Sequence, residues 1–111
     1  MVAPREIWWA EVEGAERDKV WLCVVVRVAS DFVEVVYGQG SPGKDADAIE
    51  VIPGTLDGDR YFQVTKPTYF RSTNVALLRG ARLKRRVGFC TRDLFGAFCA
   101  LAERFNTKAG E

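Results

Sequence analysis

The chain has 111 residues, 48% of them hydrophobic and 28% charged, and a net charge of +1. These values are typical of a soluble globular protein and predict a single domain, residues 1–111, with its core at about residues 4–106. Histidine is absent, which excludes a Ser-His catalytic pair and removes the commonest metal ligand. We therefore expect no metal site and no cofactor.

Cysteine content and hydropathy indicate the compartment. The three cysteines (Cys23, Cys90 and Cys99) are odd in number and form no Cys-x-x-Cys pair, so we expect reduced thiols in a reducing environment. The longest apolar run, Val20 to Val26, is too short to cross a bilayer. The N-terminus also lacks the pattern of a secretory signal. These features predict a cytoplasmic protein without a membrane partner.

Three strands are predicted in the first third of the chain. Residues 6–12 alternate imperfectly between apolar and acidic side chains, as in a strand with one solvated face. Residues 20–27 are almost all apolar and rich in valine, which is typical of a central strand buried on both faces, so Cys23 should be buried. Residues 32–37 predict a third strand, antiparallel to the second.

A loop and several shorter strands follow. Residues 38–47 are predicted to form a mobile loop, because residues 38–43 contain three glycines and a proline. Beyond this loop, short strands are predicted over residues 48–52, 61–64, 68–70 and 74–78, separated by turns.

The last element is a helix, predicted over roughly residues 91–106 with Thr91 as its N-cap. Its apolar residues recur at the spacing of one helical face: Leu94, Phe98, Leu101 and Phe105. Several short strands and one terminal helix predict a mainly β protein, a small and strongly bent sheet or barrel with the helix laid across it.

Charge is distributed unevenly along the chain. Residues 1–59 contain twelve Asp and Glu against five Lys and Arg, whereas Arg60 to Arg92 contains nine basic residues and no acidic one. The nine are Arg60, Lys66, Arg71, Arg79, Arg82, Lys84, Arg85, Arg86 and Arg92. If they share one face, they form a surface for a polyanion. The alternative is that they are solvated charges folded against the acidic half. Residues 82–86 in particular are expected to be a flexible segment that contributes nonspecifically to binding or is merely solvated.

Aromatic residues are interleaved with these cations. Tyr61-Phe62 and Tyr69-Phe70 lie among Arg60, Lys66 and Arg71, a mixture that stacks bases while it neutralises phosphates. At strand periodicity one ring of each pair points inward. By the same rule, one of Trp8 and Trp9 should be a core residue and the other partly exposed, and an exposed tryptophan would favour a protein interface. The candidate residues for binding RNA are Arg60, Lys66, Tyr69 and Arg71.

The order of these elements resembles that of the PemK/MazF family of toxin endoribonucleases, which are small SH3-like barrels. The matching stretches are Arg5-Glu6-Ile7-Trp8-Trp9, Lys19 to Val26, Lys66 to Phe70, Asn74 to Leu78 and Arg82 to Gly88. The resemblance implies a toxin–antitoxin endoribonuclease that cuts single-stranded RNA without a metal. It also implies a homodimer and an acidic antitoxin-like protein as partner.

Two departures concern the family's arginines. Trp21-Leu22 stands where the family has an Arg-Pro pair, and Asn74 to Leu77 stands where the family has a second arginine. The family's Ser/Thr after its third strand corresponds to the region of Gln39 to Ser41.

Two functions from different classes follow. A metal-independent ribonuclease would use Lys19 or Arg17 beside the loop, with Ser41 or Gln39 supplying hydrogen bonds. Lys19 is otherwise a solvated loop lysine, and Ser41 a turn residue next to Pro42. The alternative is a catalytically inactive barrel that binds nucleic acid or a protein partner.

Overall fold

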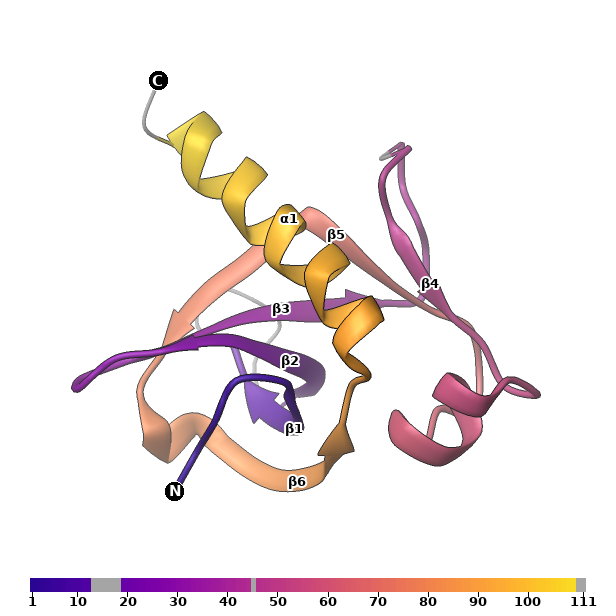
Figure 1. The fold of residues 1–111 in the computed structure, drawn as a ribbon, viewed down its shortest axis with the longest axis horizontal. Helices are drawn as coiled ribbons and strands as arrows, with labels where there is room; N and C mark the ends of the chain where they lie inside the picture. The colour runs from indigo at the N-terminus through magenta and orange to yellow at the C-terminus, as the bar shows by residue number, and fades with distance from the viewer. Residues whose placement is uncertain (13–18, 45, 110–111) are drawn as a thin grey trace.

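The computed structural model describes residues 1–12, 19–44 and 46–109 (Figure 1). Within these residues the chain forms strands, two short helical turns and one long helix. In chain order they are β1 (Glu6–Glu11), β2 (Val20–Val28), β3 (Val33–Gln39), β4 (Ile49–Val51), η1 (Asp57–Tyr61), β5 (Thr68–Leu78), η2 (Gly80–Arg82), β6 (Leu83–Phe89) and α1 (Arg92–Ala109). The prediction of a mainly β fold with a C-terminal helix is confirmed.

The strands form one 6-stranded sheet with the order β4-β5-β3-β2-β1-β6, and every neighbouring pair is antiparallel. In Figure 1 the sheet curls strongly, and α1 lies across it. β2 lies inside the sheet between β1 and β3, as predicted for the central strand, and Cys23 within it is fully buried. The result is a curled half-barrel crossed by a helix.

Apolar side chains cover both faces of the sheet, which explains the almost unbroken apolar sequence of β2. Leu22 and Val24 point to the face that packs with Phe98 of α1. Cys23 and Val25 point to the opposite face, into a second apolar cluster. Because successive side chains of a strand alternate between faces, a strand between two clusters needs an apolar residue at every central position.

The helix begins where the sequence predicts. The Thr91 Oγ1 atom accepts the N–H of Leu94 at 3.4 Å, so Thr91 caps the helix. Phe98 and Leu101 are buried, and the ring of Phe98 lies edge-on to that of Phe70 with centroids 4.9 Å apart. The apolar face of α1 therefore anchors it to the sheet. No helix in the described part of the chain has the length and apolarity to span a membrane.

The prediction of a strand over residues 61–64 is wrong. Asp57–Tyr61 forms η1, a single π-helical turn, and Gln63 has a left-handed backbone with φ 53°. Gly58 permits this turn, because a Cβ atom there would lie 1.8 Å from the carbonyl oxygen of Ile52. Phe62 consequently enters the core from a turn, and its full burial does not require a strand.

Two further strand predictions need correction. Residues 68–70 and 74–78 belong to one strand, β5, whose pairing with β3 passes from Phe70 directly to Val75 through an irregularity. Residues 82–86, expected to be flexible, belong largely to β6, which pairs with β1. The charged sequence of β6 gives no local strand signal, so pairing with β1 decides its conformation.

The two tryptophans of β1 lie on opposite faces, as alternation requires. Both are half-buried, so the expectation that one is a core residue is wrong. Each indole packs against the margin of its apolar cluster and not at the centre. The three cysteines are free thiols, as predicted.

Candidate nucleic-acid interface

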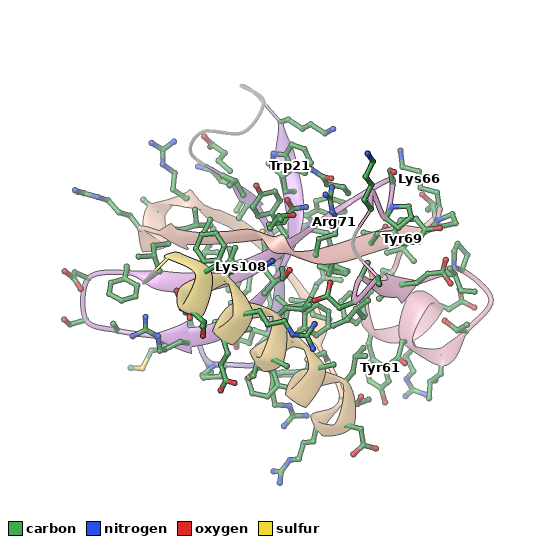
Figure 2. The ribbon with its side chains drawn as sticks, turned by 90° about the horizontal axis from the view of Figure 1, so that it is seen from above. Trp21, Tyr61, Lys66, Tyr69, Arg71 and Lys108 are labelled. Atoms are coloured by element: carbon green, nitrogen blue, oxygen red, sulfur yellow. The ribbon has the colours of Figure 1, made fainter. Side chains whose placement is uncertain are left out.

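A row of polar and aromatic side chains crosses the sheet where β3 ends and β2 and β5 begin. Tyr37 and Gln39 are two residues apart on β3 and share a face. Gln39 pairs with Tyr69 on β5, and Tyr37 pairs with Cys23 on β2. We call this set of side chains the Arg71 row: Lys19, Trp21, Tyr37, Gln39, Tyr69 and Arg71. Figure 2 shows Trp21 and Arg71 close together, with Tyr69 and Lys66 farther along the same side.

Arg71 is held in place from two directions. Its Nη1 atom donates a hydrogen bond to Gln39 Oε1 at 2.9 Å. Gly43 lies against the guanidinium group, since a Cβ atom at Gly43 would be 2.7 Å from Arg71 Cζ, and its φ of 63° also favours glycine. The loop after β3 therefore approaches Arg71 closely at a residue without a side chain. A half-buried, oriented guanidinium is suited to binding a phosphate.

The other end of the row is aromatic. Lys19 Nζ lies 4.4 Å from the centroid of the Trp21 ring. The rings of Trp21 and Tyr37 meet edge to face, with centroids 5.5 Å apart. Cationic and aromatic groups in this arrangement can hold a phosphate and stack a base.

Both tyrosines of the row keep their protons at neutral pH. Burial raises the pKa of Tyr37, and the nearby Cys23 thiol adds to this, while Arg71 acts in the opposite direction. The pKa of Tyr69 is raised chiefly because its hydroxyl hydrogen-bonds to Glu50 on β4. The phenols can therefore donate hydrogen bonds, but they are not suited to accept a proton near pH 7.

The structure brings together four of the residues predicted for the site, namely Lys19, Gln39, Tyr69 and Arg71. Ser41 lies in the loop after β3, where its Oγ atom accepts the N–H of Gly43 at 3.2 Å, which is turn chemistry.

Other predicted residues lie elsewhere. Arg60 belongs to η1 and is exposed, and Lys66 lines a separate groove before β5. Arg17 lies outside the described residues. Sequence reasoning did not select Trp21 and Tyr37 for this site, although the period-two alternation of Tyr37 with Gln39 was a usable signal.

Several cations of the Arg60–Arg92 stretch are neutralised by the acidic half. Arg82 and Lys84 lie 3.2 Å and 3.0 Å from the carboxylate of Glu11. The hydrogen bond from Lys84 and its charge lower the pKa of Glu11. Arg86 lies 3.3 Å from Glu6 Oε2. For these three residues the alternative prediction is confirmed: their charges are folded against carboxylates of the acidic half.

Glu6 is a buried carboxylate, only 4% exposed. Burial raises its pKa, but hydrogen bonds from the Trp8 indole, the Ala3 N–H and Arg86 outweigh this, so the pKa lies below the ordinary value. Among the described residues, no group of three or more Cys, Asp or Glu is placed to hold a metal ion.

The fold class and the row together define a curled SH3-like half-barrel with a polar and aromatic row across one end of its sheet. The Mycobacterium tuberculosis toxin MazF-mt6 is similar to the chain in structure, with a TM-score of 0.69 at 15% sequence identity. The match covers 93% of this chain and 97% of the toxin. No protein-family model and no curated protein sequence matches. The fold is thus that of MazF-like toxins, which confirms the predicted PemK/MazF-type barrel.

Proposed function

We propose that the protein is an endoribonuclease of the toxin–antitoxin type that cuts single-stranded RNA at the Arg71 row without a metal ion. The observation that carries this proposal is the Arg71 guanidinium, held by Gln39 at the start of β5 and close to the Trp21–Tyr37 pair. The MazF-like fold supports it, since a solved structure with this fold, MazF-mt6, is that of a toxin.

The chemistry follows from the groups in the row. Attack of a ribose 2′-hydroxyl on the adjacent phosphorus produces a phosphorane with extra negative charge. Arg71 would stabilise that charge and Lys19 would add a second cation, while Gln39 keeps the guanidinium oriented. The row contains no imidazole, and the carboxylate that it contacts, Glu50, is hydrogen-bonded to the Tyr69 hydroxyl. The rate enhancement should therefore come mainly from electrostatic stabilisation, with the proton of the 2′-hydroxyl passing to water. The phosphorane then collapses as the bond from phosphorus to the 5′-oxygen breaks, which leaves a 2′,3′-cyclic phosphate and a 5′-hydroxyl that takes its proton from water.

The test is cleavage of a single-stranded RNA oligonucleotide in the presence of EDTA. Wild-type protein should yield products that end in a 2′,3′-cyclic phosphate, and DNA of the same sequence should stay intact because it lacks the attacking hydroxyl. Arg71→Gln should lower the cleavage rate by about a hundredfold, the usual cost of one charge-stabilising donor. Arg79→Gln is the matched control, since Arg79 is exposed and follows the opposite end of β5. Equal rates for both variants would contradict the assignment.

A second function is favoured by one specific observation. Neither tyrosine of the row is suited to take a proton near pH 7, because the pKa of each is raised. A protein with this row could bind single-stranded RNA and leave it intact. Tight, salt-sensitive binding of an oligonucleotide without turnover would favour this binding module over the enzyme.

The partner predictions remain part of the proposal. A homodimer should appear in light scattering as a mass near twice that of the 12.4 kDa chain. An acidic antitoxin-like protein, encoded next to this chain, should co-purify with it and block access of RNA to the row. Both the protein and its RNA substrate are expected in the cytoplasm.

A further inference from the structure

A groove lies on the sheet face opposite the Arg71 row, at the same end of the sheet. It has a volume of about 300 Å³, and a shallower hollow that shares Trp9 and Arg85 continues it. The residues that matter for its chemistry are Trp9, Leu22, Val64, Lys66, Thr68 and Arg85. We call this site the Trp9 groove.

Strand register assembles the floor of the Trp9 groove. Trp9 on β1 pairs with Leu22 on β2 and with Arg85 on β6, so these three side chains form one line across three strands. Leu22 is 3% exposed and supplies the apolar base, while Trp9 is half-buried and Arg85 is exposed. The segment before β5 brings Lys66 and Thr68 to the opposite side.

The groove carries two cations, Lys66 and Arg85. Among the described residues, the side chains of Lys66 and Arg85 make no ion pair, in contrast to Lys84 and Arg86 beside Arg85. Two such cations around an indole and an apolar base are complementary to a ligand with negative charge and a flat ring. A nucleotide of a single-stranded nucleic acid has both features.

The groove and the Arg71 row meet at the ends of the same two strands. On β2, Trp21 belongs to the row and Leu22 to the groove, and on β5, Tyr69 belongs to the row and Thr68 to the groove. From Thr68 to Arg71 the strand advances only roughly 10 Å, a distance that neighbouring nucleotides can cover. An RNA strand that passes around this end of the sheet would contact both.

We propose that the Trp9 groove binds nucleotides that flank the phosphate held at the Arg71 row, with the indole of Trp9 against a base and Lys66 and Arg85 against phosphates. This proposal rests on the proposed function for its ligand, single-stranded RNA. It adds a second contact region, and it predicts that affinity depends on the length of the RNA.

The experiment compares two uncleavable 2′-O-methyl RNA oligonucleotides, of about three and about twelve nucleotides, by fluorescence anisotropy. Arg85→Gln should weaken binding of the longer RNA roughly fivefold, flatten its salt dependence by about one unit and leave the shorter RNA unaffected. Arg86→Gln is the matched control, because Arg86 is the neighbouring arginine on the opposite face and is engaged by Glu6. Trp9→Leu, which keeps an apolar base, should reproduce the length-selective loss.

The outcomes separate the two proposals. If Arg85→Gln weakens both lengths or neither, or if Arg86→Gln has the same effect, the Trp9 groove is not an RNA subsite. If Arg71→Gln leaves both lengths unchanged while Arg85→Gln has its selective effect, the Arg71 row fails and the groove stands. If wild-type protein binds neither RNA at low salt, both proposals are overturned. Circular dichroism of each variant verifies that it is folded.

Discussion

Arg85 and Arg86 are neighbours in the sequence, yet they lie in different electrostatic environments. Arg85 pairs with Trp9 on the face covered by α1, where it lines a groove without a carboxylate partner among the described residues. Arg86 pairs with Trp8 on the opposite face, 3.3 Å from Glu6 and 5.3 Å from the centroid of the Phe89 ring. One cation is available to a ligand, and the other is part of the structure. The two environments differ because successive side chains of β6 point to opposite faces of the sheet. The charge content of the strand does not decide them.

The comparison also explains how the acidic half of the chain is used. Glu6 Oε1 accepts hydrogen bonds from the Ala3 N–H at 3.1 Å and from the Trp8 indole at 3.0 Å, and Oε2 faces Arg86. A buried carboxylate with three donors is satisfied, and it fixes the start of the chain to β6. Arg85 has no corresponding acceptor among the described residues. We expect stability effects on the Arg86 side and ligand effects on the Arg85 side.

The largest stability effect is expected when Glu6 is changed. Glu6→Gln preserves the shape and the bonds from Ala3 and Trp8, but it places an amide donor opposite the Arg86 guanidinium. The free energy of unfolding should fall by about 2 kcal/mol, measured by urea denaturation. The double variant with Arg86→Gln should recover part of that loss, because it removes the unpaired cation. An additive double variant would show that the pair does not act as a unit.

The next effect is a pH dependence of the stability that Glu6 contributes. Because the pKa of Glu6 in the folded protein lies below its ordinary value of 4.5, the carboxylate stabilises the fold fully above that value. Its contribution declines as the pH falls through the folded-state pKa. The stability difference between wild type and Glu6→Gln should therefore be constant at neutral pH and shrink in acid. A difference that grew in acid would contradict the assigned sign.

The smallest effect is expected when the two arginines are compared directly for stability. Arg86→Gln breaks an ion pair whose arginine side chain is 52% exposed, and it should cost less than about 1 kcal/mol. Arg85 makes no ion pair with the described residues, so Arg85→Gln should leave the unfolding midpoint unchanged. Thermal unfolding of the two variants side by side measures both. A larger loss for Arg85→Gln would reverse the roles of the two faces.

The local sequence pattern was sufficient to predict several elements. The valine-rich run of β2 and the four-three-four spacing of Leu94, Phe98, Leu101 and Phe105 each carry their own periodicity, and the structure has the corresponding strand and helix. Thr91 as the cap follows from the same local chemistry. In the Arg71 row, the candidates Lys19, Gln39, Tyr69 and Arg71 came from composition and a family resemblance. The register of β3 and β5 brings Gln39, Tyr69 and Arg71 together, and the pairing of β2 with β3 places Lys19 and Trp21 beside them.

The sequence by itself determined which segments are apolar on one face or both, and hence the central strand, the terminal helix and the mainly β class. Only the tertiary structure decided the conformation of the charged and turn-rich segments. β6 forms because β1 offers a pairing edge, and η1 forms because Gly58 can approach the Ile52 carbonyl. The tertiary structure also gave Arg82, Lys84 and Arg86 carboxylate partners and placed Lys66 and Arg85 in a groove. Charged residues give no periodic pattern in the sequence from which their surroundings could be predicted. The strands that lie next to them in space decide those surroundings.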